Sequence, residues 1–556
     1  MLNQVFVMKS LHKDLLILSV LFVIIAVAIS GCTGQGQQAG KENAGVSSTQ
    51  ADTIYLAASD CGYPQPFTCY TRGPSSAKVR MIFDSLVERD EKGIIPWLAE
   101  SWDISDDGLE YTFYLRDDVY WQDGEPFTAE DVKFTFDYEL DNVPVTGSIE
   151  SGIVKSVEVI NSGTVKFILE NPASTFLYKL TGFYIIPEHI YANVSDPTSY
   201  LEPDAVTGTG PYILDEYNKE HGTYRFVTNE NFWGPDTAIQ TVEFVPVSDE
   251  MISFEQGEID FTGITPDVLE RFESDPDVRI VQQPAFWAYQ FYFNMNECPE
   301  LGDKRVRQAF AYAVDRDELI EKIARGAGKP GKMGILPEDH IWYNPDQPAY
   351  SYDPEKAKEL LDEAGWTDTD GDGIRDKNGE KMSYSLTTGE DTQVRIAEII
   401  KERLGEVGID VQVKALESRS RDANLVSGDF DLLINGYGGW GQDPDYLRSR
   451  YCVYEKGSGG NAVSSGAESW GYNNEELNQL GLLQLQELDE DVRKDLIYQM
   501  QTILADDVPA LPLYYTTSYD VWRISDYDGW MNMYDHHART HSKLSYLMRD
   551  GVAAKR

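Results

Sequence analysis

Residues 98–136 constrain the fold of this chain more than any other stretch. They read LAESWDISDDGLEYTFYLRDDVYWQDGEPFTAEDVKFTF. Ser105-Asp106-Asp107-Gly108 supplies an Asp-Gly turn between two short strands, and the second strand alternates apolar side chains on one face, namely Leu109, Tyr111, Phe113 and Leu115. Thr128 then begins a helix, with Asp131 in the capping-box position. The pattern predicts a hairpin followed by a capped helix.

The sequence of this stretch closely resembles the motif of the family 5 extracellular solute-binding proteins, the peptide/nickel-type receptors of ABC importers. Other segments resemble the same family: residues 185–190 (IIPEHI), 207–212 (TGTGPY), 231–234 (NFWG), 256–260 (QGEID) and the strand-loop-helix of residues 289–325. The resemblance therefore covers much of the chain and not a single motif.

This resemblance implies an α/β fold of the periplasmic-binding-protein type II, with two lobes, an extra inserted domain and a hinge. A chain of 556 residues is too long for one core, and its strands and helices are interleaved as in α/β proteins. We expect the hinge near residues 293–294 and 514–515. The expected boundaries are residues 53–87, 206–293 and 515–543 for lobe 1, 88–205 for the inserted domain, 294–514 for lobe 2 and 544–556 for a C-terminal tail.

The N-terminal segment has the composition of an export signal followed by a tether. Lys9 and Lys13 precede an apolar run at residues 15–29, which has the length of a signal-peptide core and is short for a membrane span. The run ends in Ile29-Ser30-Gly31-Cys32, which matches a lipobox, although a chance cysteine after a secretory leader is the alternative. We predict a signal peptide at residues 1–31, lipidation of Cys32 and a flexible linker at 32–52. The body is then expected outside the cell, anchored to the outer face of the cytoplasmic membrane.

Acidic residues outnumber basic ones by 93 to 47, which gives a formal charge of −46. This charge argues against nucleic acid or an anionic bilayer as a partner for the body of the protein. The carboxylates are interpreted as a solvated surface, adapted to a saline medium. No Gly-x-Ser-x-Gly or His-Glu-x-x-His motif occurs, and Met333 stands where a phosphate-binding loop at residues 326–333 would need Ser or Thr. We expect a monomer that is not an enzyme.

Four cysteines follow the leader: Cys61, Cys69, Cys298 and Cys452. An even number outside the cytoplasm favours disulfides, and three connectivities are open. The short loop favours Cys61–Cys69. Cys298–Cys452 would then follow, joining two stretches that the resemblance places in one domain. A cysteine metal site is the rival interpretation, but the sequence has no CxxC pair.

Two segments have metal-ligand spacing. Asp368, Asp370, Asp372 and Asp376 occupy positions 1, 3, 5 and 9 of a calcium loop, but position 12 is Gly379 and the acid Glu380 comes one residue late. An Asp/Gly-rich turn between a helix and a strand is the alternative to a structural calcium. Near the C-terminus, a second segment combines histidines and an acid, namely Asp535, His536, His537 and His541, of which the last two have helical i, i+4 spacing.

Residues 435–445 (NGYGGWGQDPD) are the predicted ligand-binding loop. Glycines give access to the main chain and aromatic rings give stacking surfaces, although a packing turn is the alternative. The resemblance implies that this loop lines the ligand cleft. The predicted ligand-binding residues are Tyr437, Gly438, Gly439, Trp440, Gln442, Asp443, Trp287, Tyr289 and Tyr63. In the family's peptide receptors an Asp of this loop holds the ligand's amino terminus, and counting back from Asp443 puts Trp440 at that position.

The resemblance implies capture of a solute outside the cell by hinge closure, followed by delivery to an ABC permease whose separate ATPase subunit hydrolyses ATP. A di- or oligopeptide is the expected ligand. An oligosaccharide or other small solute is the first alternative, favoured by Trp440 and the many aromatic residues. A metal or metal chelate is the second, favoured by the histidines and the Asp loop. No cofactor is required beyond the structural calcium considered above.

Overall fold

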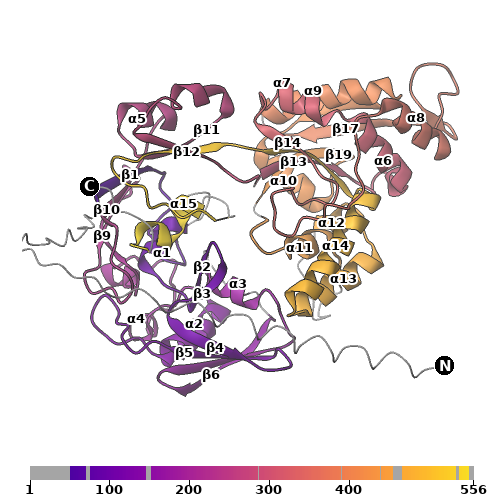
Figure 1. Ribbon diagram of the computed structural model, residues 1–556. Coiled ribbons are helices and arrows are strands. Elements are labelled where there is room, and N and C mark those ends of the chain that lie inside the picture. Colours follow the sequence, from indigo (N-terminus) through magenta and orange to yellow (C-terminus); the bar gives the residue numbers. More distant parts are fainter. Residues whose placement is uncertain are drawn as a thin grey trace, which may run out of the picture. The chain divides into compact units, whose positions relative to one another are not determined.

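The computed structural model describes residues 51–69, 76–145, 149, 152–285, 287–389, 391–438, 440–454, 466–533 and 538–549. The expected signal peptide, Cys32 and almost all of the expected linker lie outside these residues. Within the described ranges, no helix combines the length and the apolar character needed to cross a membrane. The α/β class is confirmed, because helices alternate with strands that form two large sheets (Figure 1).

The first large sheet has the order β12-β21-β11-β1-β10-β9-β8. Its strands are β1 (Ala51–Ala57), β8 (Tyr212–Asn218), β9 (Thr223–Thr228), β10 (Ile239–Val245), β11 (Phe261–Ile264), β12 (Val278–Gln282) and β21 (Tyr519–Arg523). The helices of this region are α1 (Ser76–Ile82), α5 (Glu250–Gln256) and α15 (Ala538–His541). The end of the chain is fixed to this region by a buried ion pair between Lys543 and Asp84. Trp97 and Thr209 also donate hydrogen bonds to Asp84, so the pair is fully enclosed.

The strands of residues 98–136 belong to a separate antiparallel sheet of order β4-β5-β7-β6. The strands are β4 (Ala99–Ile104), β5 (Glu110–Leu115), β6 (Val154–Asn161) and β7 (Thr164–Leu169), with the hairpin β2 (Val87–Asp90) and β3 (Gly93–Pro96) before them. Its helices are α2 (Ala129–Asp141), α3 (Phe176–Leu180) and α4 (Glu188–Tyr191). The capping box of α2 is confirmed, since the Thr128 N–H donates to Asp131 at 2.9 Å.

The second large sheet has the order β14-β20-β13-β19-β17-β18. Its strands are β13 (Trp287–Phe293), β14 (Gly328–Pro330), β17 (Ser383–Thr388), β18 (Asp410–Ala415), β19 (Leu432–Gly438) and β20 (Ala510–Thr516). Alternate residues of β13 enter two different hydrophobic clusters: Phe291 and Phe293 pack on one face, and Ala288 and Tyr292 on the other. The sheet is therefore buried on both faces.

Helices cover both faces of this second sheet, with α7 and α9 on one side and α11 to α14 on the other (Figure 1). The helices of this part are α6 (Lys304–Ala313), α7 (Arg316–Lys322), α8 (Pro354–Glu363), α9 (Asp391–Glu406), α10 (Ser418–Ser427), α11 (Tyr446–Tyr451), α12 (Gly466–Ser469), α13 (Glu475–Gln486) and α14 (Glu490–Asp507). Asp489 accepts hydrogen bonds from the first N–H groups of α14 and so fixes where that helix begins.

The crossing between the two large sheets differs from the sequence expectation at one point. Residues 206–293 were expected in lobe 1, but β13 pairs with β19 and β20 as a central strand of the second sheet. The chain therefore leaves the first sheet after Gln282, at the end of β12, and not near residue 293. It returns between Thr516 and Tyr519, close to the expected second crossing. The remaining domain boundaries stay predictions.

Candidate functional site

The predicted ligand-binding loop begins on β19, a strand whose two edges differ. On one side β13 pairs with the whole strand, from Leu432 to Gly438. On the other side β17 pairs with Leu432 and Leu433 alone. In the part of the chain that the structure describes, no strand covers residues 434–438 along that second edge. The end of β19 therefore has no strand partner on this side among the described residues, and we call residues 434–438 the open edge.

The glycines of β19 make room for an aromatic side chain of the neighbouring strand. A Cβ atom at Gly436 would lie 2.4 Å from Cζ2 of Trp287, so only glycine lets this indole lie across the strand. Trp287 is 42% exposed, whereas Tyr289 is half-buried on the same strand. Tyr437 pairs with Ala288, so strand alternation puts it on the opposite face of the sheet from Trp287 and Tyr289.

The stacking role predicted for Trp440 is not supported, because the side chain is only 2% exposed. Its ring lies 5.5 Å from that of Tyr446 and 5.8 Å from that of Tyr515, and its indole N–H donates to the carbonyl of Ala285 at 3.1 Å. Burial of so large an apolar surface stabilises the loop, which is why the ring turns inward. Trp440 supports the site and does not offer a free surface to a ligand.

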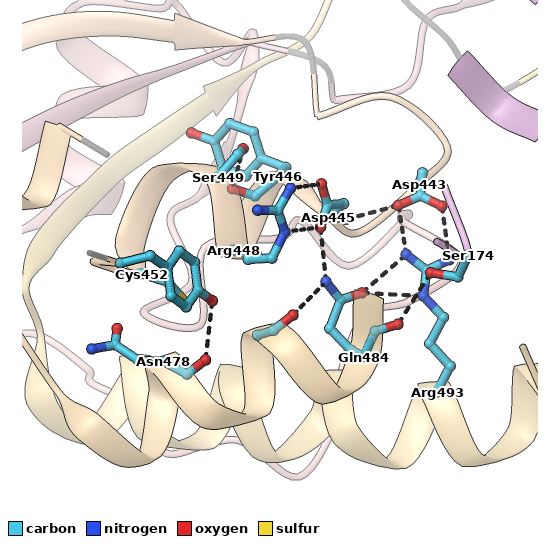
Figure 2. A network of polar contacts seen from close by, with 12 residues as sticks. Ser174, Asp443, Asp445, Tyr446, Arg448, Ser449, Cys452, Asn478, Gln484 and Arg493 are labelled. Atoms are coloured by element: carbon cyan, nitrogen blue, oxygen red, sulfur yellow. Dashed lines mark hydrogen bonds and ion pairs between the residues drawn. The ribbon is translucent and has the colours of Figure 1, made fainter. Parts of the chain in front are cut away.

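Asp443, another predicted ligand-binding residue, is occupied by an intramolecular ion pair (Figure 2). Both of its carboxylate oxygens accept from Arg493 of α14, at 2.7 and 2.8 Å. Arg493 also donates to Oε1 of Gln484 at 3.0 Å. A direct contact of Asp443 with a ligand would require this bidentate pair to open, so the structure assigns Asp443 to support of the loop.

The same network continues from Gln484 to a second acid. Its Nε2 donates to Asp445 at 2.8 Å, and Asp445 accepts from Nε and Nη2 of Arg448 at 2.5 and 2.7 Å (Figure 2). Burial alone would raise the pKa of the Asp445 carboxyl, but the Arg448 guanidinium more than offsets it, and the pKa lies below its ordinary value. We name Asp443, Asp445, Arg448, Gln484 and Arg493 the closed network.

The inserted domain touches this part of the loop. The Ser174 N–H donates to the carbonyl of Leu485 at 2.7 Å, and its hydroxyl donates to that of Gln484 at 3.1 Å. The main-chain N–H of Gln442 donates to the hydroxyl of Tyr178 at 3.4 Å. These bonds join α3 of the inserted domain to the start of α11 and the end of α13.

A different polar group lies under β19 and β13. Arg450 of α11 donates from Nη2 to the Tyr292 hydroxyl at 3.2 Å, and its guanidinium lies 4.8 Å from the ring centre of Tyr437. The Tyr292 hydroxyl in turn donates to Oε1 of Gln290 at 2.8 Å. We name Gln290, Tyr292, Tyr437, Tyr446 and Arg450 the arginine–tyrosine cluster.

The other predicted ligand-binding residues are dispersed. Tyr63 packs 5.8 Å from Tyr217 in the hydrophobic cluster of the first sheet, whereas Tyr437 belongs to that of the second. Gly438 and Gln442 are half-buried in the loop, and Gly439 lies outside the described residues. The structure thus brings Trp287, Tyr289, Tyr437, Gly438 and Gln442 to one end of β19 and β13 and leaves Tyr63 in another cluster.

The carboxylates of the predicted calcium loop lie near one another and near a lysine side chain. Carboxylate oxygens of Asp368, Asp370 and Asp376 lie within 4.8 Å of one another. Asp372 does not belong to this group and pairs instead with Lys381, which also contacts Asp370 at 2.9 Å. Asp376 begins the small hairpin of β15 (Asp376–Lys377) and β16 (Glu380–Lys381). Calcium would have to compete with the Lys381 ammonium, and its binding here stays a prediction.

The structure places one of the two predicted cysteine pairs close together. The Sγ atoms of Cys61 and Cys69 face each other at 2.8 Å, and their disulfide stays a prediction. Cys298 and Cys452 are free thiols in different hydrophobic clusters, and Sγ of Cys452 donates to the carbonyl of Leu477 at 3.4 Å. The Cys298–Cys452 disulfide is therefore not supported. Of the C-terminal histidines, His536 and His537 lie outside the described residues.

Sequence reasoning missed the arginines and Gln484 that complete the loop. Arg493 follows Asp443 by 50 positions, and no local pattern connects the two. Asp445 and Arg448 have i, i+3 spacing on a helix, which is a readable signal for an ion pair. Arg450 lies two residues further along the same helix, and its lack of an acid at helical spacing was visible in the sequence.

Comparison with known proteins gives these residues a context. The family model for "Bacterial extracellular solute-binding proteins, family 5 Middle" matches residues 93–458. The oligopeptide-binding protein AppA of Bacillus subtilis (strain 168) is 32% identical over 456 residues, which cover 77% of this chain and 81% of that protein. The nickel-binding periplasmic protein of Escherichia coli (strain K12) is 32% identical over 382 residues, covering 66% and 71%.

A solved structure agrees with the fold. The oligopeptide-binding protein AppA from Bacillus subtilis, in complex with a nonapeptide, superposes with a TM-score of 0.68 at 25% identity, covering 90% of this chain and all of that one. The family match includes β4, β5, β13, β19 and the loop that leads to α11. This chain belongs to the bacterial extracellular solute-binding proteins of family 5.

Proposed function

We propose that this protein is the receptor of an ABC importer that captures a peptide outside the cell and delivers it to a membrane permease. The family to which this chain belongs is one of bacterial extracellular solute-binding proteins, which supports the general part of the proposal. The permease and a separate ATPase are the partners. The choice of a peptide as ligand is carried by the open edge of β19.

An extended peptide can add to such an edge as a further strand. The main-chain N–H and C=O groups of residues 434–438 would pair with those of the ligand, which gives affinity without selecting a side chain. Gly436 and Gly438 have no side chain to hinder the approach. The 42% exposed indole of Trp287 offers an apolar surface beside the edge. The similarity to an oligopeptide-binding protein solved with a nonapeptide supports the same ligand class.

The alternatives have less support in the structure. An oligosaccharide receptor was favoured by stacking on Trp440, and that ring is buried. A metal chelate has the nickel-binding relative in its favour. We propose further that closure occurs about the two crossings after Gln282 and Thr516, that the receptor is a monomer, and that Cys32 carries the lipid that holds it at the outer face of the membrane.

The test uses peptides with altered main chains. Purified protein is titrated with a random pentapeptide pool and with the same pool N-methylated at alternate positions, since each methyl group removes one strand-pairing donor. Binding should weaken about tenfold when the methylated positions face β19 and change little when they face away. A nickel–histidine chelate and cello-oligosaccharides are titrated beside them. Binding of either of these, with none of the peptide pool, would refute peptide capture.

A further inference from the structure

We propose that the arginine–tyrosine cluster is a subsite that binds a carboxylate of the captured solute, in the first place the C-terminal carboxylate of a peptide. The identity of the solute rests on the proposed function. The anionic group is inferred independently, from the contacts of Arg450 and of the side chains around it.

Arg450 is a cation without an acidic partner among the described residues. Arg448, two residues earlier on α11, pairs with Asp445, whereas the contacts of Arg450 are the Tyr292 hydroxyl and the rings of Tyr292 and Tyr437. Burial raises the pKa of the Tyr292 and Tyr446 phenols above the ordinary value, so these groups are neutral at physiological pH. The positive charge is therefore partly stabilised by cation–π contacts with aromatic rings but is not neutralised by an anion.

Within the part of the chain that the structure describes, several donors of this region have no acceptor. The buried atoms without a hydrogen-bond partner include Nε of Arg450, Nε2 of Gln290 and Oη of Tyr446. Gln290 is fully buried, and its Oε1 already accepts from Tyr292 and from Tyr451, which leaves the amide N–H groups unused. Folded proteins satisfy nearly all buried polar atoms, so a concentration of unused donors around one guanidinium indicates an external acceptor.

A carboxylate matches this donor set. It is planar, carries two oxygens that accept several hydrogen bonds, and fits the fork of an arginine. Its negative charge supplies what the neutral tyrosines do not. The formal charge of the chain is −46, so its surface as a whole repels anions, and an unpaired guanidinium is a local exception that selects for one.

The position of the cluster fits the end of a bound peptide. Arg450 and Tyr437 are half-buried residues, although Nε of Arg450 itself is buried. Tyr437 belongs to the open edge of β19 and contacts both Arg450 and the ring of Tyr446, whose centre is 5.0 Å away. A strand added along residues 434–438 would end beside this group. The edge would hold the main chain of the peptide and the cluster its terminal charge.

The experiment compares a random pentapeptide pool that has free C-termini with the same pool amidated, by isothermal titration. The wild-type protein should prefer the free acids about 10- to 100-fold. Arg450→Gln should lose this preference, chiefly because it binds the free acids more weakly. Arg419→Gln removes one exposed arginine of α10 and is the matched control, which should keep the preference. Tyr446→Phe removes only a hydroxyl and should weaken free-acid binding a few-fold, so the proposal stays testable if Arg450→Gln does not fold.

Amidated peptides that end in Asp or Glu, compared with Asn or Gln, separate a side-chain carboxylate from a terminal one. Equal affinity of the wild type for free and amidated pools, or a preference that survives in Arg450→Gln, would overturn the subsite. If the wild type binds no peptide, the proposed function fails, and a citrate titration decides the inference. Citrate binding that Arg450→Gln abolishes would support a carboxylate subsite, and no citrate binding would overturn it.

Discussion

The closed network and the arginine–tyrosine cluster are both built around α11, but their polar groups differ in whether they have hydrogen-bond and ion-pair partners. In the closed network each guanidinium meets a carboxylate, and Gln484 joins the two ion pairs (Figure 2). In the arginine–tyrosine cluster, Arg450 donates to a phenol, and several buried donors have no hydrogen-bond partner within the described part of the chain. A buried network whose members satisfy one another fixes a structure, whereas one with surplus donors is incomplete without a further group.

The two arginines of α11 show most directly how a paired and an unpaired guanidinium differ. Arg448 is 1% exposed in its side chain and lies between two oxygens of Asp445. Arg450 keeps some exposure and pairs with no acid among the residues that the structure describes. The same residue type, two positions apart, therefore has opposite expected effects on replacement: loss of stability at the first position and loss of binding at the second.

The largest effect is expected from opening the closed network. Asp445→Ala leaves the buried Arg448 guanidinium without its carboxylate, which should lower the free energy of unfolding by about 3–5 kcal/mol. Urea denaturation measures this loss. Replacing both partners, Asp445→Leu with Arg448→Met, should recover most of it, because no charge is then left unpaired. If Asp445→Ala were as stable as wild type, the closed network would not stabilise the loop.

A pH experiment tests the loop between the two groups. His340 has its Nε2 3.0 Å from the carbonyl of Gly441, and burial lowers its pKa to about 4. Because the pKa of His340 is lower in the folded state than in the unfolded state, the folded protein favours the neutral imidazole. The stability that neutral His340 contributes is fully present above about pH 6.5 and is lost as the pH falls through about 4. The loss amounts to about 3 kcal/mol. His340→Gln should not lose stability in this window, so unfolding curves of the two proteins from pH 7 to 4 should converge; parallel curves would contradict the assignment.

The elements were predictable where the signal was local. The capping box at Thr128 and Asp131, and the Asp353 cap with Pro354 at the start of α8, involve residues within three positions of one another. The place of β13 was not, because sheet membership depends on partners at residues 432–438 and 510–516. A run of apolar residues predicts a strand but not the sheet to which it belongs.

The site was predictable as a region but not as chemistry. Glycines and aromatics marked residues 435–445, and β19 does end there at an open edge. The sequence could not tell that Trp440 turns inward or that Asp443 is paired, because Ala285 and Arg493 lie far away along the chain. For Arg450 the sequence showed that no acid stands at helical spacing, but it could not show that no acid among the described residues reaches Arg450 in three dimensions.

The cluster should behave differently from the closed network in a stability experiment. Arg450→Met removes a charge that has no acidic partner among the described residues, so the free energy of unfolding should change by less than about 1 kcal/mol in either direction. Urea denaturation of this variant beside Asp445→Ala gives the comparison directly. If Arg450→Met were as destabilising as Asp445→Ala, the cluster would be a second structural network and the contrast would fail.

The smallest effect on stability is expected at the exposed aspartates of the predicted calcium loop, which already pair with a lysine. Lys381 contacts Asp370 and Asp372, and ion pairs with this exposure contribute less than about 1 kcal/mol to stability. Lys381→Ala should therefore unfold like wild type. It should bind calcium more tightly, because the competing ammonium is gone while Asp368, Asp370 and Asp376 keep their oxygens together. Calorimetric titration with calcium checks this, and a variant with no gain in affinity would show that these carboxylates, although close, are held by hydrogen bonds that a cation does not displace.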